Sequence, residues 1–422
     1  MTEHTQLARR LGTFDAVVIG LGSMIGAGVF AAFAPAAGSA GALLLVGLAL
    51  AAGVAYCNAV ASAQLAAQYP TSGGTYVYGR ERLGEWWGFL AGWGFVIGKT
   101  ASCAAMALTF AAYAVPGPRW LERLVAAVAV VTLTGVNLRG ITRTAGLTRI
   151  LVAISLVALA IVAGVILGSG DASTGNLTWD LPNGLYGVLQ SAGLLFFAFA
   201  GYARIATLGE EVRDPQRTIP RAIPLALGIT VAVYAVVAAS VLLVLGPDRL
   251  AASVTPLENA VRAVGADWAV PLVDIGAAVA SLGALLALIA GIGRTTLAMA
   301  REGDLPRWLS SVHPRFQVPD HAELVVAGAV TILVLTTDLR GAIAFSSFGV
   351  LTYYAIANAS AWTQSGEWRR WPRALNAVGL VGCVTLVVTL PFSAIIVGLA
   401  MFGIGLAWRA LTRRRAALSL PA

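Results

Sequence analysis

The sequence predicts an all-α integral membrane protein with twelve transmembrane helices. Three observations carry this prediction. Hydrophobic residues make up 58% of the 422 residues and charged residues only 11%, and the mean hydropathy is +0.81. Because soluble domains carry about 25% charged residues, this composition excludes a soluble enzyme, a disordered chain and a disulfide scaffold. The 47 glycines suit close packing of helices in lipid.

Each predicted helix is an apolar stretch close to the roughly 20 residues that cross a bilayer. The predicted spans are, in chain order, 14–36, 41–67, 86–114, 120–138, 147–168, 185–209, 220–245, 268–298, 322–338, 341–362, 374–390 and 391–410. The last two meet at a tight turn at Pro391. The longest connections are 169–184, 246–267 and 299–321, so no large soluble domain is expected between spans.

The basic residues predict the orientation, because cytoplasmic loops are enriched in Lys and Arg. With the N-terminus inside, 21 of the 28 basic residues fall in inner segments or at inner span ends. Five fall outside, namely Arg119, Arg123, Arg249, Arg262 and Arg340. This bias predicts that both termini are cytoplasmic. It also accounts for the net charge of +8 without a nucleic-acid partner.

The sequence carries no pattern typical of a catalytic or metal centre. No Gly-rich loop ends in Gly-Lys-Ser/Thr, and no His/Cys cluster has metal-ligand spacing. No Ser/His/Asp set is visible either. We therefore expect no enzymatic activity, no cofactor and no metal. A channel would need rings of pore-lining polar groups, and a sensor would need an output domain. The sequence shows neither pattern, so we expect neither a channel nor a sensor.

Two spans carry signals for a break at mid-membrane. The first has glycine at positions 20, 22, 26 and 28, and each costs about 1 kcal/mol relative to alanine in a helix. The sixth places Gly201 among aromatic residues and Arg204 just beyond it. Interrupted helices at matching positions of two inverted halves indicate the central site of a transporter. For the first span the alternative is a continuous helix with a glycine-rich packing face.

Four sequence blocks resemble the amino acid–polyamine–organocation superfamily of transporters. They are GSMIGAGVF at 22–30, YPTSGGTYVYGRERLGEWWGFLAGW at 69–93, FFAFAGYARIATLGEEVRDPQRTIPRAI at 196–223 and GRTTLAMAREGDLP at 293–306. The resemblance implies one transport domain with a 5+5 inverted-repeat core in which helices 1 and 6 are discontinuous. The first repeat would cover 1–168 and the second 185–362, with two peripheral helices at 374–410.

The resemblance also implies a substrate site at the two breaks. In family members the carboxylate of the amino acid binds backbone amides of the first break, and the amine binds carbonyls of the sixth-span break. Phe197 stands where an aromatic residue commonly covers the substrate, although a packing role is the alternative. The implied substrate-binding residues are Ile25, Gly26, Ala27, Gly28, Phe197, Ala198, Ala200 and Gly201.

Charged residues inside the spans form a candidate coupling network of Lys99, Arg204 and Asp274. Lys99 is the only lysine in the chain, and a lysine can release its proton where an arginine cannot. Its alternatives are a structural counter-ion or a side chain that snorkels to the interface. Arg204 is a candidate partner for Asp274, and the alternative places Asp274 near the outer surface. Proton-coupled relatives often carry a lysine in span 5, but Ala153 stands there in this chain.

The substrate class follows from the same charges. A carrier for polyamines or arginine should offer carboxylates to the extra cation, whereas these spans offer Lys99 and Arg204. Neutral amino acids are therefore favoured, with acidic ones as the alternative. We expect proton-coupled uptake across the cytoplasmic membrane of a bacterium by alternating access, without an obligate protein partner. The alternatives are an exchanger or exporter without proton coupling, a cationic amino acid or polyamine carrier, and a non-transporting sensor.

Overall fold

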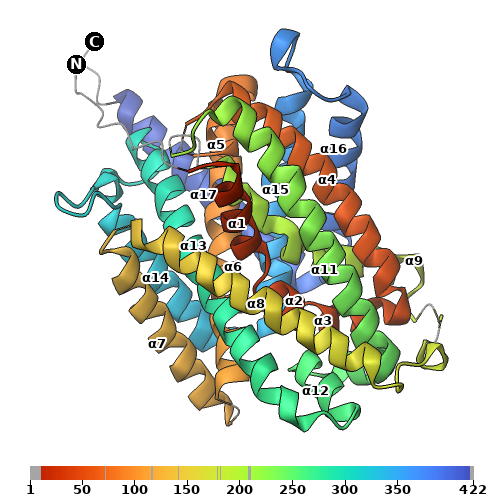
Figure 1. The fold of residues 1–422 in the computed structure, drawn as a ribbon. Helices are drawn as coiled ribbons and strands as arrows, with labels where there is room; N and C mark the ends of the chain where they lie inside the picture. Colours follow the sequence, from red (N-terminus) through yellow and green to blue (C-terminus); the bar gives the residue numbers. More distant parts are fainter. Residues whose placement is uncertain are drawn as a thin grey trace.

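A computed structural model describes residues 11–71, 73–115, 117–140, 142–177, 179–180, 182–207 and 211–418. Helices make up most of this described part, and the chain folds into one bundle (Figure 1). Two segments far apart in sequence pair at one edge, where the backbone N–H of Leu11 donates to Glu211 and that of Arg213 donates to Leu11.

The observed helices follow the predicted spans to within a few residues at most ends. The α-helices are α1 (Thr13–Met24), α2 (Ala27–Ala31), α3 (Phe33–Ala40), α4 (Leu44–Gln68), α5 (Thr75–Leu83), α6 (Glu85–Ala114), α7 (Arg119–Asn137), α8 (Thr142–Gly168), α9 (Gly184–Phe199), α10 (Ala203–Ala206), α11 (Pro215–Ala252), α12 (Pro256–Ala263), α13 (Val270–Arg301), α14 (Asp320–Thr336), α15 (Leu339–Trp362), α16 (Arg373–Val388) and α17 (Phe392–Leu418). The short 3-10 helix η3 (Ala200–Tyr202) joins α9 to α10. Helix α11 turns at Gly246, whose φ is 69°, one residue beyond the predicted span 220–245.

Ten helical stretches of the described chain are long and apolar enough to cross a bilayer. Two further helices match predicted spans but are shorter, because α14 has 17 residues and α16 has 16. At 1.5 Å per residue they extend about 25 Å, less than the roughly 30 Å of a bilayer core. The structure thus supports a multi-span helical membrane protein, and the count of twelve stays a prediction.

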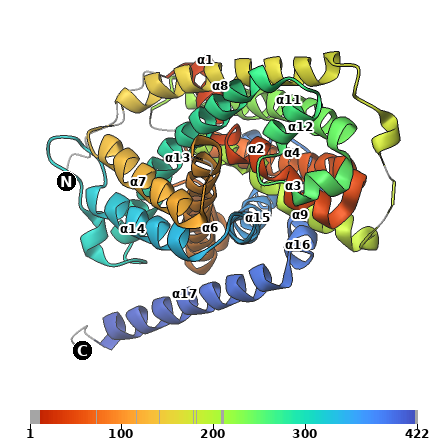
Figure 2. The same ribbon diagram turned by 90° about the horizontal axis from the view of Figure 1, so that it is seen from below.

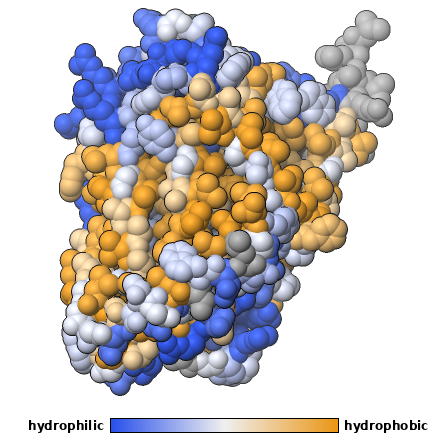
Figure 3. Space-filling view, turned by 90° about the vertical axis from the view of Figure 1, so that its right-hand side faces the viewer, coloured by the Kyte–Doolittle hydropathy of each residue, from blue (hydrophilic) through white to orange (hydrophobic). Residues whose placement is uncertain are grey.

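The helices differ in how deeply they are buried. In the most apolar window of each stretch, 89% of the residues are buried for Thr13–Ala31 but only 28% for α7 and for α17. Seen along the bundle, α6 and α2 lie near the centre, and α17 lies apart along one edge (Figure 2). The side view shows a broad apolar band between two hydrophilic ends (Figure 3). The discontinuous first span is therefore the core around which the others pack.

An apolar groove of about 640 Å³ runs along the outside of this core. Its walls come from α6, α14, α15 and α17, and include Trp93, Phe345 and Met401. The indole N–H of Trp93 donates to the carbonyl of Met401 at 2.9 Å, which joins α17 to α6. Helix α17, which stands apart in Figure 2, forms one wall of the groove, and this hydrogen bond attaches it to α6.

Buried ion pairs also fix α17 at the face where α1 begins and α17 ends, which we call the terminal face (Figure 1). Arg409 of α17 lies 3.1 Å from Asp304, which follows α13. Their side chains are only 1% and 2% exposed. Arg80 of α5 approaches the same carboxylate at 3.7 Å, and the Tyr76 hydroxyl donates to it at 2.9 Å. We call Arg409, Asp304, Arg80 and Tyr76 the terminal clamp.

The surroundings of the clamp are partly apolar. The Arg409 guanidinium lies 4.8 Å from the ring centroid of Trp86 and 4.9 Å from that of Phe89. Burial raises the pKa of Asp304, because the ionised carboxylate loses its water, while the Tyr76 hydroxyl and the nearby guanidinium groups oppose that shift. The clamp therefore joins α5, α6 and the end of α13 to the last helix.

We predict that Arg409→Met lowers the free energy of unfolding by about 3 kcal/mol, because loss of one partner from a buried pair leaves an uncompensated charge. Thermal unfolding in detergent measures this loss, and adding Asp304→Asn should restore part of it. The matched control is Arg413→Met on the same helix. Arg413 pairs with Glu85, and both side chains are 44% exposed, so the control should lose less than about 1 kcal/mol. Equal losses in the two variants would contradict the clamp.

Candidate functional site

The first span is interrupted between α1 and α2, as its glycines predict. Ile25 has φ −77° and ψ 94°, and Gly26 has φ −157° and ψ −139°, so both leave the helical conformation. A Cβ on Gly26 would lie 2.8 Å from the Cβ of Ala284 and 2.9 Å from the sulfur of Met106. Glycine at this position therefore lets α6 and α13 approach the broken backbone directly.

The sixth span is interrupted at η3, between α9 and α10, and this second break lies against the first. A Cβ on Gly201 would lie 2.2 Å from the carbonyl oxygen of Ser23 and 2.6 Å from the amide nitrogen of Met24. On the other side of the contact, a Cβ on Gly28 would lie 2.5 Å from that of Ala198. The two interrupted spans thus meet through backbone at three of the eight residues that the resemblance implied.

Tyr234 of α11 connects the two breaks. Its hydroxyl lies 2.6 Å from the carbonyl oxygen of Met24, at the end of α1, and 3.1 Å from that of Ala198, near the end of α9. Because a tyrosine hydroxyl carries one proton, it donates to one of these carbonyls at a time or shares the proton between them. A buried side chain thereby satisfies acceptors that the interrupted helices leave open.

Lys99 of α6 lies at the second break. Its ammonium donates to the carbonyl of Ala200 at 2.9 Å, and the hydroxyl of Tyr354 donates to the same oxygen at 3.3 Å. The Lys99 side chain is 3% exposed. This position places the only lysine of the chain next to one of the predicted amine-binding carbonyls, and it contradicts the alternative in which Lys99 snorkels to the interface.

Met106 lies at the first break, on the same helix as Lys99. Its sulfur accepts a hydrogen bond from the backbone N–H of Ala27 at 3.1 Å. That N–H belongs to the first turn of α2, where backbone donors have no partner inside the helix. A thioether is a weak acceptor, so a carboxylate would bind this amide more strongly.

Phe197 is buried in the last turn of α9, at 4% exposure. Its neighbours make the aromatic contacts around the breaks: Phe199 lies 5.2 Å from Tyr234 and Phe196 lies 5.8 Å from Tyr354, measured between ring centroids. Among the described residues, no ring contact involves Phe197 itself. This leaves its ring without an aromatic partner beside the second break.

The expected pair of Arg204 and Asp274 does not form. Arg204 donates to Thr207 at 2.9 Å and packs against Gly291 of α13. Asp274 lies near the other end of α13, close enough to Glu258 and Arg262 to interact electrostatically. Along a helix, Gly291 and Asp274 are about 25 Å apart. The prediction was wrong because it rested on opposite charges in apolar segments. It did not take account of the distance along α13 that separates Asp274 from the contact of Arg204.

Comparison with known proteins identifies the family. The profile described as amino acid permease matches residues 11–406. The chain belongs to this family. The permease is 62% identical over 413 residues to an uncharacterized transporter of Mycobacterium tuberculosis, covering 97% of this chain and 93% of the relative. It is 26% identical over 429 residues to the branched-chain amino acid permease of Bacillus subtilis (95% and 92% covered). It is 29% identical over 338 residues to the methylthioribose transporter of the same species (75% and 73% covered).

These matches confirm the resemblance to the amino acid–polyamine–organocation superfamily. The protein is therefore a transporter and not an enzyme, and its apolar helices and mycobacterial relatives identify a multi-pass bacterial membrane protein. The family membership agrees with the two breaks, which contact each other at Gly201 with Ser23 and at Gly28 with Ala198.

Buried charged residues lie between the breaks and the terminal face. Arg294 of α13 pairs with Glu211, which precedes α11. Glu323, in the first turn of α14, is fully buried against Gly293, and within the described part of the chain neither of its carboxylate oxygens has a hydrogen-bond partner. The sequence analysis missed Glu323, Tyr234 and Met106. These three residues look like ordinary members of apolar or amphipathic helices, so only tertiary contacts reveal them.

We predict that Gly201→Ala slows transport by about tenfold or more, because the added Cβ forces the two breaks apart. Initial rates of amino acid uptake in proteoliposomes measure the effect. Gly228→Ala on α11 is the matched control, since no atom of the described residues outside its own helix lies within 4 Å of the added Cβ. Uptake by Gly201→Ala at the rate of the control would show that the contact with Ser23 does not matter for function.

We predict that Tyr234→Phe lowers the free energy of unfolding by about 1–2 kcal/mol, because it leaves a buried carbonyl without its donor, and that it also slows transport. Tyr113→Phe is the control. It loses a similar bond, from the Tyr113 hydroxyl to the carbonyl of Phe30 at 2.9 Å, which lies at the far end of α2 and does not join the two breaks. Thermal unfolding should fall in both variants, and uptake only in Tyr234→Phe. A matching uptake defect in both would mean that loss of stability alone explains it.

Proposed function

We propose that the permease is a secondary active transporter that takes up amino acids, neutral ones in particular, by alternating access and with proton coupling. The observation that supports it most is the pair of facing breaks. At the first break the backbone N–H of Ala27 donates to the sulfur of Met106. At the second break the carbonyl of Ala200 accepts from the ammonium of Lys99. These are the groups that a zwitterion needs at its two ends.

The proposed binding mode follows from backbone chemistry. A helix N-terminus favours an anion, because its amide groups are unpaired and the helix dipole is positive there. The substrate carboxylate would therefore replace Met106 at Ile25, Gly26, Ala27 and Gly28. The amine would bind the carbonyls of Phe197, Ala198 and Ala200, because each carbonyl oxygen has two lone pairs and can accept a second hydrogen bond beside that of Lys99 or Tyr234. Gly201 would keep the two breaks close enough for one molecule to reach both.

The preference for neutral substrates rests on charge. The ammonium of Lys99 lies at the second break, so a second cationic group on the substrate would be repelled there. Relatives of similar identity are named a branched-chain amino acid permease and cationic amino acid transporters, so the preference rests on Lys99 and not on the relatives. Acidic amino acids are the alternative that Lys99 would tolerate.

Lys99 is the proposed proton carrier. In its protonated form it donates to the Ala200 carbonyl and holds η3 in the observed shape. When it loses its proton, this hydrogen bond loses its charge assistance and weakens, so the second break can relax. Arginine could not serve this purpose, because it stays protonated. An exchanger or exporter in which Lys99 is purely structural is the second candidate mechanism.

The proposed topology places the terminal face, and with it both termini, in the cytoplasm. It comprises twelve spans, in which 1–168 and 185–362 form inverted repeats and 374–410 lies at the periphery. The bias of basic residues toward this face supports the orientation. The contact between the breaks of the first and sixth spans supports the repeat arrangement.

We predict that neutral amino acids accumulate in proteoliposomes only under an inward proton gradient, and that Lys99→Ala loses this dependence. Labelled neutral, acidic and cationic amino acids should be compared with and without the gradient. Thr100→Val is the control, because its hydroxyl bonds to the carbonyl of Val96 within α6 and does not reach either break. Lys99→Arg keeps the positive charge but cannot release a proton, so its uptake should also lose the dependence on the proton gradient.

Two outcomes would contradict parts of the proposal. Uptake that ignores the gradient but requires unlabelled amino acid inside would identify an exchanger and leave Lys99 with a structural role. Failure of every amino acid in the panel to move, by uptake or counterflow, would contradict amino acid transport itself.

A further inference from the structure

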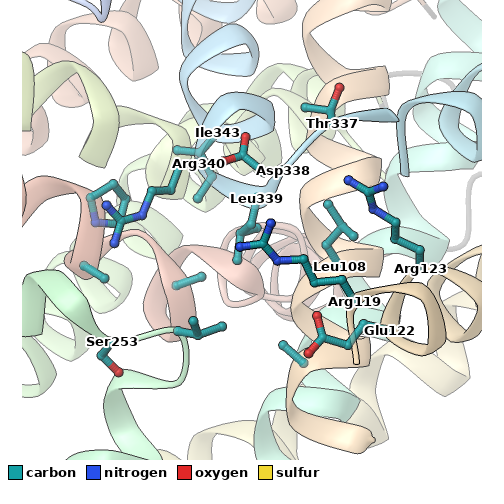
Figure 4. A pocket seen from close by; sticks show the side chains of 15 residues that line it. Leu108, Arg119, Glu122, Arg123, Ser253, Thr337, Asp338, Leu339, Arg340 and Ile343 are labelled. Carbon is teal, nitrogen blue, oxygen red and sulfur yellow. The ribbon is translucent and has the colours of Figure 1, made fainter. Parts of the chain in front are cut away.

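Basic residues converge on one pocket at the face opposite the terminal face. The five basic residues predicted outside are Arg119, Arg123, Arg249, Arg262 and Arg340, and three of them, Arg119, Arg123 and Arg340, line a pocket of about 260 Å³. Figure 4 shows the Arg119 guanidinium projecting across the opening, with Arg123 and Arg340 on either side of it. The start of α7, the link from α14 to α15 and the link from α11 to α12 form the walls.

The guanidinium groups from α7 are free to bind a ligand. No hydrogen bond or ion pair within the described part of the chain engages the side chain of Arg119 or Arg123, although Glu122 also lines the pocket. Arg340 uses one nitrogen to bind the carbonyl of Ala251. Asp338, also in the lining, caps α15 by accepting from the N–H of Gly341 at 2.9 Å. Positive charge therefore exceeds negative charge in the lining.

The other two basic residues of this face are already engaged. Arg249 donates to the carbonyls of Leu245 and Val244 at 2.8 and 2.7 Å. Arg262 pairs with Glu258 at 2.9 Å and with Asp267 at 3.5 Å. Arg119 and Arg123 therefore differ from Arg249 and Arg262, because their guanidinium N–H groups remain available to a ligand.

The pocket lies above the first break. Ala31 in its lining is one helical turn beyond Ala27, and Leu108 is the second residue after Met106 on α6. The contact of Met106 with the Ala27 amide therefore lies roughly 6 Å further into the bundle. A small molecule that entered the bundle along α2 and α6 from this face would pass the arginines first.

We propose that this pocket binds the carboxylate of an incoming small molecule at the outer face, before the molecule reaches the breaks. Arginine presents a planar fork of donors that matches a carboxylate, and a cleft lined by one sign of charge concentrates the opposite charge from solution. The pocket therefore accepts zwitterionic or anionic substrates and disfavours purely cationic ones. This inference rests on the proposed transport function, because it supplies a first contact for the same substrate.

Uptake by intact cells tests the outer face, and uptake by inside-out vesicles tests the inner face. The probe is whichever amino acid the wild type transports. We predict that Arg119→Gln and Arg123→Gln each raise KM for entry from outside by about threefold, and that both together with Arg340→Gln raise it about tenfold. KM for entry from inside should stay within twofold. Raising the salt concentration should increase the outer KM of the wild type more than that of the triple variant.

Arg249→Gln and Arg262→Gln are the matched controls, since they remove charge from the same face without touching the pocket. Their outer KM should stay within twofold of the wild type. The inference is overturned if the triple variant also stays within twofold, or if a control shifts KM as much as the pocket variants do. A parallel rise of KM at both faces would overturn it too, because it would indicate a general loss of affinity.

A binding measurement separates failure of this inference from failure of the proposed function. Trp120 lies next to Arg119 in the chain, and its fluorescence in the purified protein can be titrated with glutamate, acetate and methylammonium. Quenching by the two carboxylates, lost in the triple variant and absent with methylammonium, would support the pocket even if no amino acid were transported. No carboxylate response in the wild type, or the same response in the triple variant, would overturn the pocket while leaving transport unaffected.

Discussion

The structure depends on one constraint, which is that backbone released from a helix inside a membrane must find partners within the protein. The first and sixth spans are both interrupted, and side chains from other helices supply the missing partners. Tyr234 of α11 bonds near both breaks, Lys99 of α6 bonds at the second and Met106 of α6 bonds at the first. The positions of α6 and α11 are therefore fixed relative to the breaks, and the remaining helices pack around this assembly.

The two faces of the bundle differ in how they are held. At the terminal face, buried ion pairs join segments far apart in sequence, including Arg409 with Asp304 and Arg294 with Glu211. At the opposite face, Arg119 and Arg123 line an open pocket without such pairs. This asymmetry is what a carrier with alternating access needs in one of its states, in which one face is tied together and the other receives solute. Opening the terminal face would require the exchange of several charged contacts at once.

Much of this fold could be predicted from the sequence, because span length and glycine position act locally. The span 86–114 was predicted within one residue of α6, since its apolar run ends where polar residues begin. The break at Gly26 was predicted from glycine spacing. The pairing of Arg204 with Asp274 was predicted wrongly, because burial and opposite charge say nothing about distance along α13. Tyr234 and Met106 were missed, since tyrosine and methionine in an apolar helix look the same whether they pack against lipid or bond to backbone.

The short helix α14 has a consequence for the surrounding lipid. Its 17 residues reach about 25 Å, whereas the hydrocarbon core of a bilayer measures roughly 30 Å. In the proposed twelve-span topology, the membrane beside α14 thins or interfacial side chains extend outward, and each ångström of mismatch costs a fraction of a kcal/mol. α14 also borders the apolar groove next to α6, the helix that carries Lys99 and Met106. Any conformational change that tilts α14 therefore changes the deformation of the bilayer, so acyl-chain length becomes a variable in the transport cycle.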